Sequence, residues 1–220
     1  MKKPVIDYRE FRLSRLNEPR FSHLKLLGGW IGYFILYFLT ENFIPMERNH
    51  VIHCRLDELI PFNEGFLIFY VSWYALIVFC LIVFALYDVK SFRNLSKFII
   101  VTQAVAMAIY ILWPSYQDLR PASFERDNIL TRLMAFIYAF DTPTGVCPSL
   151  HVAYTMGICS VWLKKKDASL LWKVVLTVWG VLICISTAFV KQHSVLDILA
   201  AIPLGILAEI VVFHWFWKEK

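Results

Sequence analysis

Residues 66–87 read FLIFYVSWYALIVFCLIVFALY, an apolar stretch without a charged side chain. An α-helix needs about 20 such residues to cross the hydrocarbon core of a bilayer, so this stretch predicts a transmembrane helix. Other apolar stretches, some interrupted by a polar residue, predict further spans. Together the six predicted spans are Leu26–Ile44, Phe66–Tyr87, Phe98–Pro114, Ser149–Leu163, Val174–Val190 and Val195–Trp217. The sequence therefore predicts an all-α, polytopic membrane helix bundle.

The composition supports a membrane protein. Of the 220 residues, 59% are hydrophobic and the mean hydropathy is +0.58, whereas soluble domains are about 45–50% apolar. The net charge of +5 is best explained by membrane topology and by contact with anionic lipid, because the basic residues form no stripe typical of a nucleic-acid-binding fold. We expect no nucleic-acid partner, and the oligomeric state is left open.

Most of the 22 Lys and Arg residues lie in alternate connections between the predicted spans. These segments are the N-terminal arm, residues 90–97, residues 164–173 and the C-terminal tail. The positive-inside rule places them, and both termini, in the cytoplasm. We expect a basic arm over residues 1–25 and one membrane domain over residues 26–217. The arm is predicted either as a basic helix on the inner membrane surface or as a disordered segment.

Two short polar segments lie at the ends of predicted spans. The first is Cys147–His151 (CPSLH), and the second is Lys191–His193 (KQH) with Asp197 after it. Ionisable groups at membrane depth are costly, which makes them candidates for function. His193 and Asp197 are spaced to share one helix face, where a carboxylate can fix the tautomer of an imidazole. The alternative to a functional role is a structural one. In that case the histidines anchor the ends of spans at the membrane interface, and His193 and Asp197 form a structural hydrogen-bonded pair.

The predicted topology places these two segments and Arg120 on the same, extracytoplasmic side. Arginine and hydroxyl groups suit a phosphate, and the amides of a helix that starts at Ser149 favour an anion. One imidazole can attack phosphorus if a carboxylate holds its other nitrogen, and a second can serve as acid and base. The segments lack the several carboxylates of Mg²⁺ or two-metal sites, so we expect neither a metal nor another cofactor.

These residues resemble the three ordered motifs of the type 2 phosphatidate phosphatase superfamily of membrane phosphatases. The matching segments, which span about half of the chain, are Arg120-Pro121, Pro148–His151, and Ser186 with His193 and Asp197. The resemblance implies six membrane helices with the motifs at the outer face. It implies that His193 is the nucleophile, Asp197 its orienting partner and His151 the general acid. Arg120 and Ser149 are implied to hold the phosphate oxygens.

The sequence departs from the family's motifs at three positions. Trp113 stands where the first motif has Lys, Leu150 where the second has Gly, and Thr187 where the third has Arg. Two phosphate-binding cations are therefore missing. Lys191 follows Thr187 by four residues, so we expect it on the same helix face and assign it to the phosphate in place of the lost Arg. The motifs also look similar to the branch related to inositol phosphorylceramide synthases, whose members can pass the phosphoryl group to an alcohol.

The predicted outer loops hold three further features. His53 and Asp57 have the spacing of a partial metal site, but this signal is weak and the sequence favours a solvated amphipathic loop. Residues 129–140 repeat apolar side chains at helical spacing, which predicts an interfacial helix, either a lid or a spacer, ended by the turn at 141–145. Cys54 and Cys147 fall on the same side of the membrane, where an oxidising compartment permits a disulfide, and we treat that bond as a hypothesis.

Three functions are consistent with the sequence. The leading one is a metal-independent phosphatase of the cell membrane that hydrolyses a phosphatidate-like or polyprenyl phosphate or diphosphate at the outer face through phosphohistidine. The second is a lipid phosphotransferase of the inositol phosphorylceramide or sphingomyelin synthase type with an alcohol acceptor. The third is a transporter that uses the intramembrane His and Asp, which predicts inverted repeats and polar groups near mid-membrane. The expected partners are a lipid phosphate and the bilayer.

Overall fold

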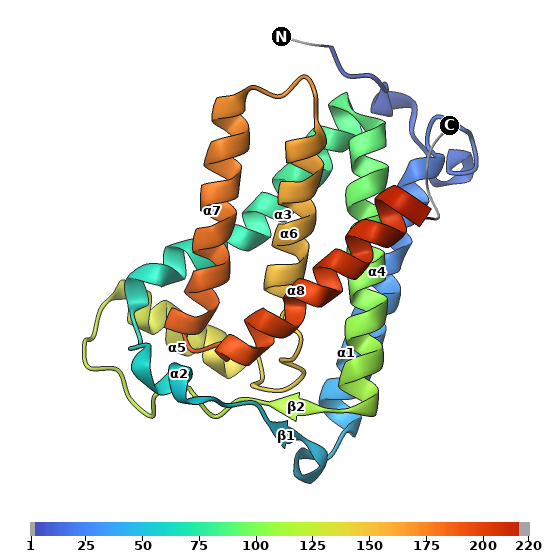
Figure 1. Ribbon diagram of the computed structural model, residues 1–220. Helices are drawn as coiled ribbons and strands as arrows, with labels where there is room; N and C mark the ends of the chain where they lie inside the picture. The colour runs from blue at the N-terminus through green and yellow to red at the C-terminus, as the bar shows by residue number, and fades with distance from the viewer. Residues whose placement is uncertain (1–2, 216–220) are drawn as a thin grey trace.

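The computed structural model describes residues 3–215 and confirms an all-α fold (Figure 1). The helices of the described residues are α1 (Gly28–Phe43), α2 (Arg55–Leu59), α3 (Leu67–Tyr87), α4 (Val89–Leu112), α5 (Ile129–Phe140), α6 (Leu150–Lys164), α7 (Leu170–Phe189) and α8 (Val195–Ile210). Two short strands, β1 (His50–Val51) and β2 (Ser115–Tyr116), pair in parallel. A π-helical turn, Val211–Trp215, follows α8. The predicted end of the last span at Trp217 and the basic tail lie outside the described residues.

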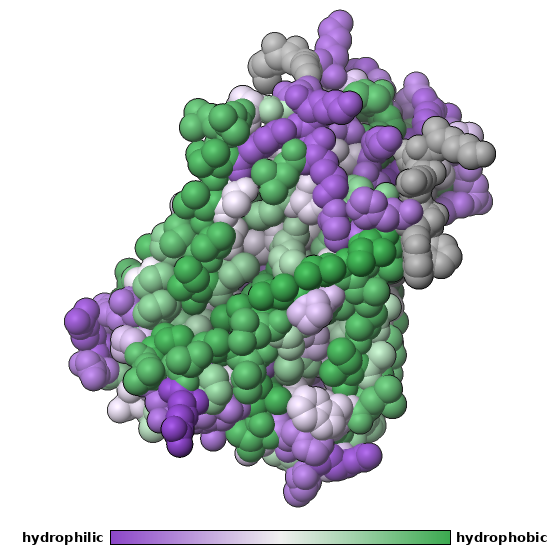
Figure 2. Space-filling model, in the orientation of Figure 1, coloured by the Kyte–Doolittle hydropathy of each residue, from purple (hydrophilic) through white to green (hydrophobic). Residues whose placement is uncertain are grey.

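Four segments that contain α3, α4, α7 and α8 are long and apolar enough to cross a membrane. They are Glu64–Tyr87, Val89–Leu112, Leu170–Phe189 and Val195–His214. Hydrophobic side chains cover the visible sides of the bundle, whereas hydrophilic side chains gather at its two ends (Figure 2). The chain is therefore a membrane protein. With 16 and 15 residues, α1 and α6 are shorter than the usual range of about 17–25, so a total of six spans stays a prediction.

The junction between α3 and α4 differs from the predicted loop. α4 begins at Val89, well before the predicted span, and Asp88 alone separates it from α3. The Asp88 carboxylate caps α4 by accepting hydrogen bonds from the backbone N–H and the hydroxyl of Ser91, at 3.1 and 2.8 Å. Lys165, which follows α6, forms an ion pair with the same carboxylate at 2.5 Å. Residues 90–97 thus lie on the first turns of α4 and not in a connection.

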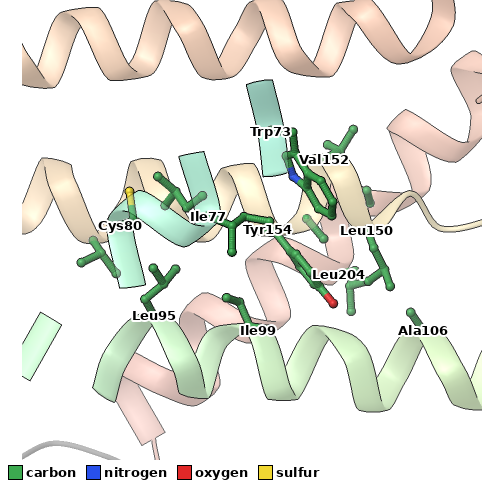
Figure 3. Packing of buried hydrophobic residues seen from close by; sticks show 14 of the residues in the cluster. Trp73, Ile77, Cys80, Leu95, Ile99, Ala106, Leu150, Val152, Tyr154 and Leu204 are labelled. Carbon is green, nitrogen blue, oxygen red and sulfur yellow. The ribbon is translucent and has the colours of Figure 1, made fainter. Parts of the chain in front are cut away.

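The hydrophobic core lies between α3, α4, α6 and α8 (Figure 3). Trp73 of α3 stacks on Tyr154 of α6, with ring centroids 5.6 Å apart and an interplanar angle of 17°. α6 approaches α4 closely at Gly157, where a Cβ atom would lie 2.5 Å from Cδ1 of Phe98. Because interiors are close-packed, a larger residue there would force the two helices apart. This packing fixes α6, which carries His151 on its first turn, in the middle of the bundle.

The described part of the N-terminal arm takes neither of its two predicted forms. It contains three short 3₁₀ turns, Tyr8–Glu10, Leu13–Arg15 and Ser22–Leu27. The Tyr8 hydroxyl contacts Nε2 of His23 at 2.7 Å and donates to the carbonyl of Ala85 at 2.8 Å. Phe21 is fully buried. Residues 3–25 are therefore packed on the ends of α3 and α4, and they belong to the same folded unit as the helices.

α2, α5 and the two strands lie at the end of the bundle opposite the N-terminal turns (Figure 1). α5 has the predicted bounds. Its start is capped by Asn128, whose side chain accepts hydrogen bonds from two backbone N–H groups of the first turn. Met134, on the apolar face of α5, is fully buried. Asp141 ends the helix and begins the segment that leads to α6.

Candidate functional site

Asp197 lies on the first turn of α8, and His193 lies in the turn just before that helix. Ser194 is the N-cap residue, and its backbone N–H donates to Oδ2 of Asp197 at 2.9 Å. Nδ1 of His193 lies 3.2 Å from the same oxygen, and Asp197 is fully buried. A buried carboxylate beside Nδ1 favours a proton on that nitrogen and leaves the electron pair of Nε2 available. His193 is therefore arranged to act through Nε2 as a base or a nucleophile.

His151, on the first turn of α6, faces His193. Nδ1 of His151 lies 3.4 Å from Nε2 of His193. The His151 ring contacts Trp73 and Tyr70 of α3, with ring centroids 4.1 and 4.7 Å apart. Its Nε2 atom is buried and has no hydrogen-bond partner among residues 3–215. The fold thus brings together two imidazoles from different helices and fixes one of them between aromatic rings.

Both histidines line a cavity of about 480 Å³. Ten of its 21 lining residues are aromatic, namely Trp30, Tyr33, Phe34, Tyr37, Tyr70, Trp73, Tyr74, Tyr110, Phe140 and Tyr154. Gln192 and Asp141 also line it, and within residues 3–215 Asp141 is the only Asp, Glu, Lys or Arg in this wall. A mostly apolar cavity with a few convergent polar groups has the usual form of a ligand site.

Arg120 and Ser149 lie close to the histidines but outside the cavity wall. The Arg120 guanidinium donates to Oε1 of Gln192 at 2.6 Å and to the carbonyl of Tyr138 at 3.0 Å. Its Nε atom has no partner among the described residues. Ser149 precedes α6, and its backbone N–H donates to the carbonyl of Asp197 at 3.1 Å. The Ser149 hydroxyl is buried and likewise unpartnered within the described residues.

Lys191 is turned away from the histidines. α7 ends before Lys191, whose φ of 52° lies in the left-handed region, so the chain leaves the helix. The ammonium group donates to the backbone carbonyls of Asp57, at 2.7 Å, and Ile60. The prediction that Lys191 shares a helix face with Thr187 is therefore wrong. In this structure Lys191 binds the α2 segment and does not replace the missing Arg.

Asp141 and Gln192 belong to the site although the sequence pointed to neither as a functional residue. The Gln192 amide connects two charges, because its Oε1 accepts from Arg120 while its Nε2 donates to Oδ2 of Asp141 at 3.1 Å. The Tyr37 hydroxyl lies 3.4 Å from Oδ1 of Asp141. Burial raises the pKa of Asp141, and the charges of Arg120 and His193 oppose that rise. Two weak signals were available, namely an acidic residue in the turn after α5 and the position of Gln192 inside the KQH segment.

Asp57 is a second residue whose role the sequence did not reveal. Its Oδ2 accepts from the Ser194 hydroxyl at 2.6 Å, and its Oδ1 accepts from the Val195 N–H at 2.8 Å. His53, the other half of the predicted metal pair, contacts Asp118 instead, at 3.1 Å. Within residues 3–215 no three His, Cys, Asp or Glu side chains are grouped to hold a metal ion. The His53–Asp57 metal hypothesis is therefore wrong, and Asp57 holds the start of α8.

The hypothetical disulfide between Cys54 and Cys147 is absent, since both thiols are free. Cys54 is the residue before α2, and its backbone N–H donates to Oδ2 of Asp57 at 2.8 Å. Cys147 packs instead with Ile52 and Val146 in a small apolar cluster. The segment between α1 and α3 is thus joined to the site by hydrogen bonds of Asp57 and not by a covalent bond.

Comparisons with protein-family models, with curated proteins and with solved structures find no match for this chain. The likeness to the type 2 phosphatidate phosphatase superfamily therefore rests on the sequence motifs alone. The geometry joins His193, Asp197 and His151 at one cavity, with Arg120 and Ser149 just behind its wall. It separates Lys191 from them.

Proposed function

We propose that this chain is a membrane enzyme that breaks a lipid phosphate ester through a covalent intermediate on Nε2 of His193. The observation that carries the proposal is the position of the two imidazoles. Nε2 of His193 faces His151 across 3.4 Å, while Asp197 holds the opposite nitrogen at 3.2 Å. Both rings line one cavity. The family resemblance implies the same roles for these three residues.

In the proposed first step, Nε2 of His193 attacks phosphorus and the bond from phosphorus to the lipid oxygen breaks. Protonated His151 donates a proton to that oxygen, so that the lipid leaves as an alcohol. Water then attacks the phosphohistidine, His151 takes a proton from the water, and the P–N bond breaks to release phosphate. Asp197 stays beside Nδ1 and offsets the positive charge that the His193 ring gains. No step requires a metal ion.

The substrate we propose is a lipid. The cavity wall includes Phe34 of α1 and Tyr74 and Val78 of α3, which are also 58%, 52% and 55% exposed on the outer surface of the bundle. The cavity therefore borders the surface that faces the bilayer, and an apolar chain can lie against its rings. Arg120 would bind phosphate oxygens once the Gln192 side chain, which now occupies it, turned away.

The membrane arrangement we propose has six spans, both termini in the cytoplasm and the site facing the extracytoplasmic side of the cell membrane. α1 and α6 are the short spans, and local thinning of the bilayer accommodates such helices. The N-terminal turns, which carry many basic residues, lie at the opposite end of the bundle from α2 and α5 (Figure 1). This separation of the basic end from the site supports the orientation.

A second candidate keeps the first step but transfers the phosphoryl group to an alcohol. Asp141 favours this candidate, because a carboxylate in the cavity wall can accept a hydrogen bond from an alcohol and hold it beside the phosphohistidine. Hydrolysis and transfer differ in their products. Transfer forms a new phosphate ester of the alcohol only when the alcohol is supplied, whereas hydrolysis releases phosphate in its absence.

The proposal is tested by assaying the purified chain in detergent against a panel of lipid phosphates. We expect His193→Ala to abolish release of the lipid alcohol, because it removes the proposed nucleophile. His214→Ala, an exposed histidine after α8, is the matched control and should leave the rate unchanged. Full activity of His193→Ala would refute the proposed nucleophile. Inhibition by EDTA would refute the metal-independent step.

A further inference from the structure

The charges around the cavity are unusual for a site that binds a doubly charged phosphate. No Lys or Arg among residues 3–215 lines the wall, and Asp141 places a carboxylate there. Trp113 and Thr187 stand where the related motifs have cations. Lys191 is engaged with the carbonyls of the α2 segment. A bound phosphate would therefore meet a negative charge in the wall without the usual surplus of positive charge.

Arg120 does not remove the repulsion between a bound phosphate and Asp141, because the amide of Gln192 contacts both Arg120 and Asp141. Oε1 of Gln192 accepts from Arg120 at 2.6 Å, and Nε2 of Gln192 donates to Asp141 at 3.1 Å. A phosphate oxygen that replaced the Gln192 amide on Arg120 would come close to the Asp141 carboxylate. The more negative the phosphate, the larger the repulsion.

The size of the effect follows from Coulomb's law. At an effective dielectric constant of about 20, one additional negative charge about 6 Å from a carboxylate weakens binding by roughly a hundredfold. Attraction to Arg120 grows with the same charge and offsets part of this loss. We therefore expect a net discrimination of about tenfold per unit of phosphate charge.

We propose that Asp141 selects a phosphodiester lipid over a phosphomonoester lipid. A phosphodiester carries one negative charge, whereas a phosphomonoester carries about 1.5 to 2 at neutral pH. The inference rests on the proposed function, since it concerns the phosphate bound at His193. With a diester, His193 attacks phosphorus, the diacylglycerol oxygen leaves with the proton of His151, and the phosphate keeps its second ester group. Water or an alcohol then attacks phosphorus and gives its proton to His151. The P–N bond breaks, and the phosphate leaves His193 with its second ester group still attached.

The test uses two short-chain lipids that differ by one methyl group, dihexanoyl phosphatidate and its phosphate methyl ester. Binding is measured in the full-length His193→Ala chain in detergent, from the rise in thermal unfolding temperature, so that neither lipid is consumed. The two lipids differ by about 0.5 to 1 unit of charge, so we expect the methyl ester to bind about three- to tenfold more tightly. Adding Asp141→Asn should abolish the preference by strengthening the monoester, whereas Asp141→Glu, which keeps the charge, should retain it.

Asp127→Asn is the matched control, because it removes one exposed carboxylate near α5 that lies outside the cavity wall. This variant should keep the preference. Equal binding of the two lipids would overturn the inference, and this result does not depend on the folding of an Asp141 variant. A preference that survives Asp141→Asn would overturn it as well. Release of dihexanoylglycerol by the wild-type chain tests the proposed function separately. If the methyl ester binds more tightly but no dihexanoylglycerol is released, the proposed enzymatic function is refuted. The inference that Asp141 selects ligands by their charge would then still hold.

Discussion

Contacts with the aromatic rings of α3 fix the position of the His151 side chain. Trp73 and Tyr70 hold its ring, and the Trp73 indole N–H donates to the His151 backbone carbonyl at 3.1 Å. A ring held in this way keeps its position when a ligand enters the cavity, which suits a group that must deliver a proton to one oxygen. Within residues 3–215 its Nε2 atom has no hydrogen-bond partner, so this atom can form a hydrogen bond with a substrate.

Replacing His151 tests whether it acts as the general acid. We expect His151→Asn to lower kcat by about 10²- to 10⁴-fold, the usual contribution of a positioned acid, with little change in substrate binding. The loss should be much smaller for a lipid analogue with an acidic leaving group, such as a nitrophenyl ester, because that oxygen departs without a proton. Steady-state kinetics with both substrates provide the measurement. Equal losses for the two would assign His151 a structural role.

The start of α8 is the element on which the site depends. Asp57 of α2 accepts hydrogen bonds from the Ser194 hydroxyl and the Val195 N–H, and it is 2% exposed. Ser194 also donates its backbone N–H to Asp197. One serine therefore bridges two buried carboxylates, and the α2 segment, far away in sequence, fixes the start of the helix that His193 immediately precedes.

We expect Asp57→Asn to destabilise the protein. The amide cannot accept from both donors of α8, so a buried N–H or hydroxyl loses its partner at a cost of about 1–3 kcal/mol. Thermal unfolding in detergent measures the effect. Glu58→Gln is the matched control, because it makes the same chemical change at the next residue, whose side chain is 68% exposed. Similar unfolding temperatures for both variants would show that the Asp57 bonds contribute little.

The contribution of Asp57 depends on pH in a defined direction. Burial alone would raise the pKa of Asp57, but hydrogen bonds from Ser194, Val195 and Cys54 outweigh it and hold the pKa below its ordinary value of 3.8. A carboxyl group with a lowered pKa stabilises the folded state above its unfolded pKa, and this stability is lost as the pH falls through the folded pKa. The difference between wild type and Asp57→Asn should therefore be constant near neutral pH and shrink below about pH 4.

For the molecule as a whole, sequence patterns predicted features that depend on residues close together in the chain, such as helices and contacts between near neighbours. The bounds of α5 follow from its apolar periodicity and its Asn128 cap. The sequence also pointed to the His193–Asp197 contact, but the expected shared helix face is wrong, because His193 precedes the N-cap of α8. The start of α4 was missed because the predicted span was drawn from the apolar run alone, and the charged first turns capped by Asp88 lie outside that run. Asp57 and Asp141 were missed because their partners lie far away in the chain, and only the fold brings them together.

The orientation in the membrane is a prediction for the whole molecule, and it depends on α6 being a span. If α6 crosses the bilayer, the loop before α5 and the connection after α6 lie on opposite sides. We expect Glu125→Cys to react with a membrane-impermeant thiol reagent on intact cells, and Lys166→Cys to react only after permeabilisation. Both positions are exposed, and Cys54→Ser removes a natural, partly exposed thiol in the segment before α2. Labelling of both from outside would mean that α6 does not cross. The reverse pattern would place the two histidines on the cytoplasmic side, where the substrate would have to be a lipid of the inner leaflet.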